Sequence, residues 1–111
     1  MVTGNATVSD HAQVSDAATI GDNAKIRGGA IVYGHAVVSG KAVISGHARV
    51  FDRAIVSGEA KIFGNARVHG RAYVSGEAQV CFKATVSGEA TISGKAIVGD
   101  HAEISGDAIL D

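Results

Sequence analysis

The chain has 111 residues and a formal net charge of −1, with 46% hydrophobic and 19% charged residues. This balance is typical of one soluble domain, and the near-neutral charge excludes a chain-wide field that would attract nucleic acid or a membrane surface. Glycine is frequent, proline and tryptophan are absent, and the aromatic residues are two tyrosines and three phenylalanines. We therefore expect a core of small and β-branched side chains.

One six-residue pattern runs through the chain. Alanine occupies every sixth position from Ala6 to Ala108, and an aliphatic residue follows two positions later, from Val8 to Leu110. A period of six fits neither an α-helix nor simple strand alternation, whereas a short fixed period is the mark of a solenoid. Because the aliphatic residue is followed by Gly or Asp two positions on in every block but that of Val80 and the last, the block predicts a short strand and a turn.

The block at residues 41–46 illustrates the predicted geometry. Side chains alternate along a strand, so Ala42 and Ile44 point inward and Val43 points outward. Gly46 lies at the corner, where Gly, Asp and Asn tolerate positive φ. Phe82 is the one departure, since it stands where Gly or Asp is expected, at a cost of about 1 kcal/mol if its φ is positive.

The aliphatic residue with a small residue four positions later, as in Ile44 with Ala48 and Val56 with Ala60, resembles the hexapeptide repeat of the bacterial acyltransferase superfamily. The resemblance covers residues 2–111 and is greatest to long G-x-A-x-V-S arrays of uncharacterised members. It implies an all-β fold, a left-handed three-sided parallel β-helix in which three blocks make one rung. The chain would form a single domain over residues 1–111, a solenoid of about six rungs with no loops or helical cap.

In such a solenoid, residues eighteen apart stack about 4.8 Å from one another, which sorts the outward positions into three faces. On the third face, every outward position before Asp111 is uncharged. A flat uncharged face predicts a surface that is covered by a partner, although β-branched residues and serines also suit any strand ladder. The predicted interface of a homo-oligomer comprises Thr19, Val37, Ile55, Tyr73, Thr91 and Ile109. A self-complementary face suggests a two-fold dimer, whereas the resemblance implies a trimer.

The second face and the corner after it gather arginines and aromatic rings over rungs two to four, and Asp52 is the acid among them. Arginine beside aromatic rings suits phosphate or carboxylate groups on flat or apolar bodies. An acidic partner protein, a phosphorylated metabolite and single-stranded nucleic acid all fit, and so does a solvent-exposed charged face without a ligand. The candidate binding residues are Tyr33, His35, Arg49, Phe51, Arg53, Arg67, His69 and Arg71.

The histidines predict neither a metal site nor catalysis. His11, His47 and His101 fall on one corner row, but the nearest pair is two rungs apart, about 10 Å, whereas zinc requires ligands at about 2 Å. The resemblance would require a histidine general base beside a coenzyme A channel, and His35 and His69 lie nearest to other polar groups. No feature marks either histidine as activated, and the loop and helical tail of the acyltransferases are missing. We therefore predict no catalytic residue, no metal and no cofactor.

The remaining signals concern the compartment. Cys81 is the single cysteine, so no disulfide forms within the chain, as is typical of a reducing compartment. No apolar run approaches the length of a membrane span, and because the repeat starts directly after Met1 we expect no signal peptide. The sequence predicts a cytoplasmic scaffold solenoid that does not bind membranes. The alternative is a coenzyme A-dependent acyltransferase, or the β-helix domain of one.

Overall fold

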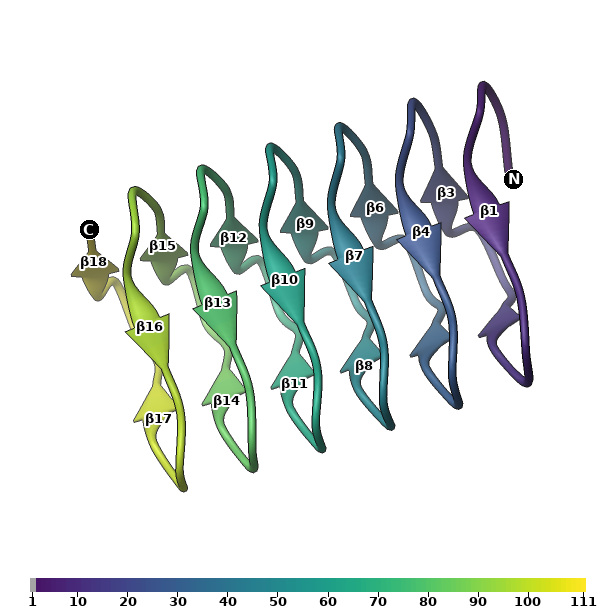
Figure 1. The fold of residues 1–111 in the computed structure, drawn as a ribbon. Coiled ribbons are helices and arrows are strands. Elements are labelled where there is room, and N and C mark those ends of the chain that lie inside the picture. The colour runs from purple at the N-terminus through teal and green to yellow at the C-terminus, as the bar shows by residue number, and fades with distance from the viewer. Residues whose placement is uncertain (1) are drawn as a thin grey trace.

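The computed structural model describes residues 2–111 as an all-β solenoid, while Met1 lies outside the described residues. The strands belong to three six-stranded parallel sheets that form the three sides of the coil (Figure 1). The first sheet contains β1 (Thr7–Val8), β4 (Lys25–Ile26), β7 (Val43–Ile44), β10 (Lys61–Ile62), β13 (Gln79–Val80) and β16 (Ile97–Val98). The second contains β2 (Gln13–Val14), β5 (Ile31–Val32), β8 (Arg49–Val50), β11 (Arg67–Val68), β14 (Thr85–Val86) and β17 (Glu103–Ile104). The third contains β3 (Thr19–Ile20), β6 (Val37–Val38), β9 (Ile55–Val56), β12 (Tyr73–Val74), β15 (Thr91–Ile92) and β18 (Ile109–Leu110).

The coil is left-handed, and its six rungs follow one another without a loop or helix in the part of the chain that the structure describes (Figure 1). The register is eighteen residues throughout, so that Lys25 pairs with Thr7 on one side and with Val43 on the other. The molecule measures 30 × 23 × 19 Å along its principal axes. The predicted fold class and the assignment of outward positions to three faces are confirmed.

Each rung is hydrogen-bonded to the next through the backbone. The amide of Val43 donates to the carbonyl of Ala60 at 3.0 Å, and the amide of Ser45 donates to the carbonyl of Ile62 at 2.9 Å. The ladder continues around the corner, where the amide of His47 donates to the carbonyl of Gly64 at 2.7 Å. Strands of two residues are therefore sufficient, because the corners take part in the same ladder.

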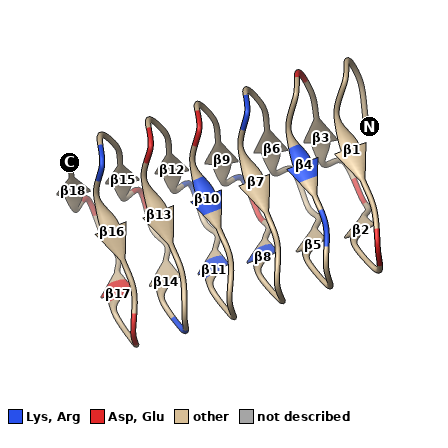
Figure 2. Cartoon of the chain, in the orientation of Figure 1, with Lys and Arg blue, Asp and Glu red and all other residues tan. Residues whose placement is uncertain are grey.

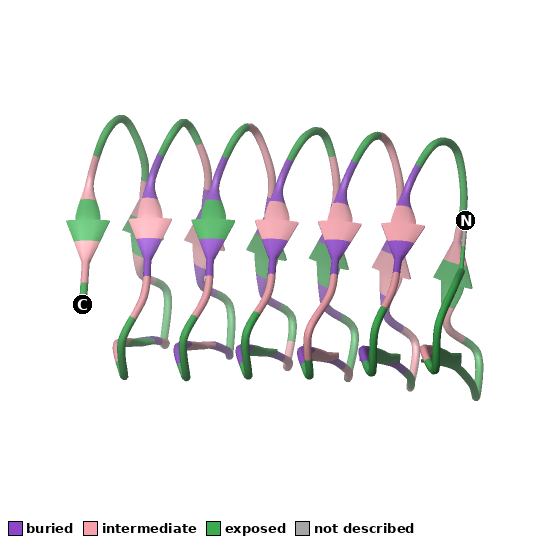
Figure 3. Ribbon diagram, turned by 90° about the horizontal axis from the view of Figure 1, so that it is seen from above, coloured by how far each residue is buried: buried purple, intermediate pink, exposed green. Residues whose placement is uncertain are grey.

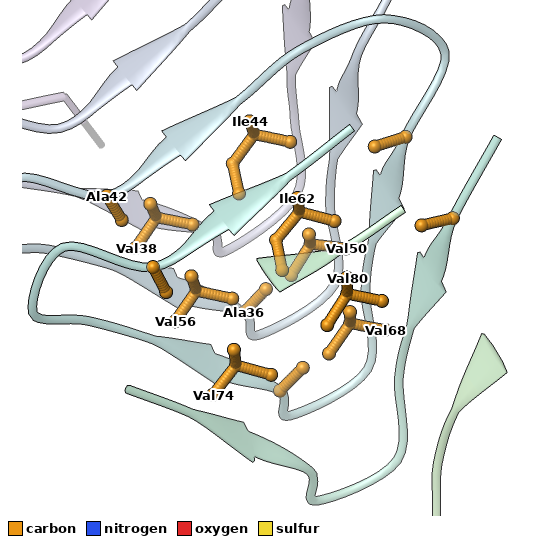
Figure 4. Close-up of a cluster of buried hydrophobic side chains, with 14 of the residues drawn as sticks. Ala36, Val38, Ala42, Ile44, Val50, Val56, Ile62, Val68, Val74 and Val80 are labelled. Carbon is orange, nitrogen blue, oxygen red and sulfur yellow. The ribbon is translucent and has the colours of Figure 1, made fainter. Parts of the chain in front are cut away.

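The core consists of stacked columns of alanine and of valine or isoleucine, one pair from each side of the triangle (Figure 4). Ala42, Ile44, Val50 and Val56 have no exposed surface. No polar or charged residue is buried within residues 2–111, so the interior needs no polar partners. At the terminal rungs, the inward side chains are only partly covered.

The corners are left-handed turns that point side chains along the solenoid axis. Every sixth residue from Gly4 to Gly106 has positive φ. At the Asp52 corner, the carboxylate accepts a hydrogen bond from the next rung, in which the Gly70 amide donates to Oδ2 at 3.2 Å. The same bond joins Asp10 to Gly28, Asp16 to Gly34 and Asp22 to Gly40. Aspartate thus replaces glycine at a corner by contributing a bond that glycine lacks.

Phe82 adopts the strained corner conformation that its position in the repeat predicts, with φ at 57°. Its ring is 63% exposed and lies beside Gly99 on the next rung, where an added Cβ would be 3.3 Å from Cδ2 of Phe82 and 3.5 Å from Sγ of Cys81. Gly99 stands at a position of the repeat where serine is the commonest residue. The absence of a side chain at Gly99 makes room for the ring and the thiol below it.

The buried columns predict that Val56→Asp will not fold. A carboxylate at this fully buried position would lack any polar partner, and the cost of several kcal/mol is comparable with the whole stability of a small domain. Circular dichroism should show loss of the strand signal. Lys25→Asp, which introduces the same side chain at an exposed outward position of β4, should remain folded. A folded Val56→Asp protein would contradict the inward register.

The corner geometry predicts that Gly88→Ala destabilises the fold more than Gly106→Ala does. Gly88 and Gly106 have φ values of 66° and 64°, so alanine at either position carries a conformational cost of about 1 kcal/mol. At Gly88, the new Cβ would also lie 2.6 Å from the amide nitrogen of Gly106, whereas Gly106 has no atom within 4 Å of its added Cβ. In urea denaturation, Gly88→Ala should lower the free energy of unfolding by roughly 1 to 3 kcal/mol more than Gly106→Ala. Equal losses would show that contact between corners does not limit the repeat.

Candidate functional site

The third face is a flat sheet with an uncharged column at its centre. Val37, Ile55, Tyr73 and Thr91 pair in register from β6 to β15. Figure 3 shows this sheet in front, from β18 beside the C-terminus to β3, with each inner strand divided into a buried and a more exposed residue. The six predicted interface residues form one continuous column, Thr19, Val37, Ile55, Tyr73, Thr91 and Ile109.

The apolar side chains of this column are accessible to a partner. Val37 and Ile55 are half-buried, whereas Tyr73 is 43% exposed and Ile109 is 71% exposed. Short serines occupy the neighbouring column, so they do not cover the larger side chains. Among the outward strand positions of this face, the charged residue is Asp111, at the C-terminal end. Its Oδ1 accepts a hydrogen bond from the Ser93 hydroxyl at 2.6 Å.

The eight predicted binding residues of the second face lie in three parallel columns. Arg49 and Arg67 pair directly across β8 and β11, which Figure 2 shows as adjacent blue strands. The aromatic residues form the next column, and the following corner carries His35, Arg53 and Arg71. The arginines and the aromatic rings are therefore side by side, in separate columns.

The aromatic column is a stack of nearly parallel rings. The ring centroids of Tyr33 and Phe51 are 4.9 Å apart with an interplanar angle of 6°, and those of Phe51 and His69 are 4.7 Å apart at 12°. Both faces of Phe51 are thus covered by its neighbours. The rungs before and after the stack carry Ser15 and Ser87, so the two outer faces of the stack are not covered by another ring.

The corner after the second face has acidic neighbours for its basic groups. Nδ1 of His69 lies 3.8 Å from Oδ2 of Asp52, and Nη1 of Arg71 lies 3.9 Å from Oε2 of Glu89. A shallow hollow of about 380 Å³ at this corner is lined by Gly34, His35, Asp52, Arg53, Gly70 and Arg71. The carboxylates of Asp52 and Glu89 therefore partly compensate for the positive charge of this corner.

The other edge of the second face carries a groove that sequence reasoning missed. It has a volume of about 490 Å³ and is lined by His47, Arg49, Asn65, Arg67, Lys83 and Thr85. Asn65 and Lys83 follow His47 at intervals of eighteen residues, so the three lie on one corner row. The side chains of a corner residue and of the strand residue two positions later meet here, which strand alternation alone does not predict.

The corner histidines do not converge with other ligands. In the described part of the chain, no group of three or more His, Cys, Asp or Glu side chains is placed to hold a metal ion. His47 instead lies against the preceding rung, with Nδ1 3.1 Å from the position of a Cβ on Gly29. Its imidazole therefore borders the groove at the end nearer the N-terminus.

Cys81 is 5% exposed, and burial raises the pKa of its thiol, with a further contribution from the charge of Asp100. Because the folded state favours the protonated thiol, this group stabilises the fold below the usual thiol pKa and loses that contribution as pH rises above it. A thiol held in its protonated form is a poor nucleophile at neutral pH. The position fits a packing role.

Comparison of the chain with known protein families, with curated proteins and with solved structures gave no match. Residues 2–111 contain no helix of the length and apolar character needed to cross a bilayer.

Proposed function

We propose that the protein is a scaffold solenoid that self-associates through its third face. The observation that carries this proposal is the registered column of uncharged, partly exposed residues that spans all six rungs of that face. The other two faces carry charged residues in the equivalent column, such as Lys61 on the first and Arg67 on the second. The occupant that best fits a flat face without charge is a second copy of the same face, because two such surfaces meet without burying an unpaired charge.

The flatness of the face favours close contact. Short serines, Ser39 and Ser57, follow Val37 and Ile55 by two positions and border one side of the column, and Tyr73 is 43% exposed. Tyrosine is enriched in interface cores because it contributes a large apolar area and a hydroxyl group. Two-fold pairing gives a dimer, whereas three copies would give the trimer that the resemblance to the acyltransferases implies.

The proposal includes the protein family and the cellular location. The hexapeptide period and the three-sided coil support membership of the hexapeptide-repeat proteins, and a cytoplasmic location accords with the single cysteine. The acyltransferase alternative would require coenzyme A binding. The scaffold proposal is preferred because the described repeat has no insertion that could close a cleft over a cofactor.

The proposed interface predicts that Ile55→Lys dissociates the assembly without unfolding it. A lysine at the centre of the face would place like charges opposite one another across a two-fold contact. Light scattering should show a change from oligomer to monomer with an unchanged circular dichroism spectrum. Ile31→Lys, at a half-buried outward position of β5 on the second sheet, should leave the oligomer intact. A wild-type protein that stays monomeric at high concentration would contradict the proposal.

We further propose that the second face binds an anionic partner of the scaffold. In the described chain, the basic side chains that lie against a carboxylate are His69, beside Asp52, and Arg71, beside Glu89, so neither Arg49 nor Arg67 is neutralised by a carboxylate. The two arginines are nevertheless direct neighbours across β8 and β11, an arrangement that costs free energy unless an anion lies between or above them.

The second face predicts salt-sensitive binding that depends on these two arginines. In a screen of anionic ligands, the wild-type protein should bind at low salt and less tightly at moderate salt, because exposed charges are screened. The Arg49→Glu, Arg67→Glu double variant should lose this binding while remaining folded. Failure of the wild-type protein to bind any anion at low salt would leave the second face as a solvated surface.

A further inference from the structure

The groove beside the arginine column is lined by hydrogen-bond donors. His47, Asn65 and Lys83 approach it from the corner row, and Arg49, Arg67 and Thr85 approach it from strands β8, β11 and β14. Guanidinium, ammonium, amide, hydroxyl and imidazole groups all donate hydrogen bonds, and no carboxylate is present among them. Such a lining suits an anion with several acceptor oxygens, and phosphate offers such oxygens both to arginine forks and to the point charge of lysine.

An equivalent groove on the first face shows that this charge is not a property of the repeat. It lies at the same corner-to-strand position and is lined by Glu59, Lys61, Glu77, Gln79, Lys95 and Ile97. Two carboxylates there offset two lysines. The second-face groove instead contains two arginines and a lysine with no acid, in a chain whose net charge is −1. The same backbone thus carries a neutral groove on one face and a cationic groove on the next.

The cationic groove continues into an apolar hollow around Phe82. The hollow has a volume of about 520 Å³, is lined by Gly64, Asn65, Phe82, Lys83, Asp100 and His101, and shares Asn65 and Lys83 with the groove. Phe82 is 63% exposed despite the strain of its corner conformation. Asp100 is the acid in the hollow, so it disfavours an anion there while the groove beside it favours one.

The aromatic stack argues against single-stranded nucleic acid as the ligand. Binding of successive bases requires a series of open ring faces, but both faces of Phe51 are covered by Tyr33 and His69, so this stack offers a base only its two ends. Phe82 is separated from this stack by the arginine column and the groove. One exposed ring and one cationic groove of small-molecule size therefore favour a ligand with one planar group and one phosphate group.

We propose that the groove and the Phe82 hollow together form a binding site for a small phosphate ester of a planar ring, such as a mononucleotide. The phosphate lies in the groove between Arg49, Arg67 and Lys83, and the ring lies against Phe82. The inference rests on the proposal that the second face binds anions, and it is independent of self-association through the third face. It also explains why the repeat departs from Gly or Asp at Phe82, since a glycine there would offer no ring to stack on.

The test is isothermal titration of the full chain with adenosine monophosphate, inorganic phosphate and adenosine, at low salt. Adenosine monophosphate should bind about tenfold more tightly than inorganic phosphate, because stacking of one base on an aromatic side chain adds to the phosphate contacts. Phe82→Gly should abolish this difference and leave phosphate binding unchanged. The variant restores the repeat residue at a position of positive φ, so its folding should not suffer.

Two charge variants locate the phosphate. Lys83→Gln, in the cationic groove, should weaken binding of both phosphate and adenosine monophosphate by about tenfold, as expected for loss of a charge-assisted hydrogen bond. Lys61→Gln, at the neutral groove of the first face, should have no effect. Equal losses of affinity in the two variants would show that the anions are attracted non-specifically by positive charge, and would overturn the proposed site.

Three further results would overturn the inference. One is the absence of adenosine monophosphate binding at low salt. Another is binding that depends on Arg49 and Arg67 but not on Lys83 or Phe82, which would preserve anion binding by the second face while excluding this site. The last is binding of a single-stranded oligonucleotide with no measurable binding of the mononucleotide, which would assign the face to a polymer.

Discussion

The hydrogen-bonded contact of one rung with the next is the interaction on which the whole structure depends. Strands of two residues have no independent stability, and each is held by amides that donate to the carbonyls of the rung above, as from Val43 to Ala60 and from His47 to Gly64. The corner adds a steric condition, because a Cβ on Gly46 would lie 2.8 Å from the amide nitrogen of Gly64. The ladder therefore requires rungs of equal length and a small residue at most corners. A repeat of six residues meets both conditions.

This contact turns residues that are eighteen apart into direct neighbours, so every surface is a set of columns. A column of like residues becomes a continuous feature, whether an uncharged strip along Val37 and Ile55 or a stack of rings through Phe51. A column of like charges becomes unfavourable unless a ligand or counter-charge compensates for it, as at Arg49 and Arg67. Function in such a fold is therefore encoded across rungs and not along a segment.

The fold and the strand columns could be predicted from the sequence because they follow from two periods, six residues along the chain and two along each strand. The column from Thr19 to Ile109 and the pairing of Arg49 with Arg67 required no further information. The corner side chains could not be placed in this way, because their directions depend on positive φ and on the rung above. For this reason the groove lined by His47, Asn65 and Lys83, the carboxylate bond from Asp52 to Gly70 and the space at Gly99 became evident only in the structure.

The corner rows can also change without disturbing the packing of the core columns. A substitution in the core columns disturbs packing against all three sides, whereas a corner residue with an exposed side chain alters only its own turn and the rung above. Phe82 is an example, since a strain of about 1 kcal/mol is small beside the stability of a domain and Gly99 leaves space for the ring on the next rung. An exposed ring beside an uncompensated cationic groove is thus obtained without interrupting the ladder, and the corner row is the part of the solenoid on which a binding site can be built while every rung stays in register.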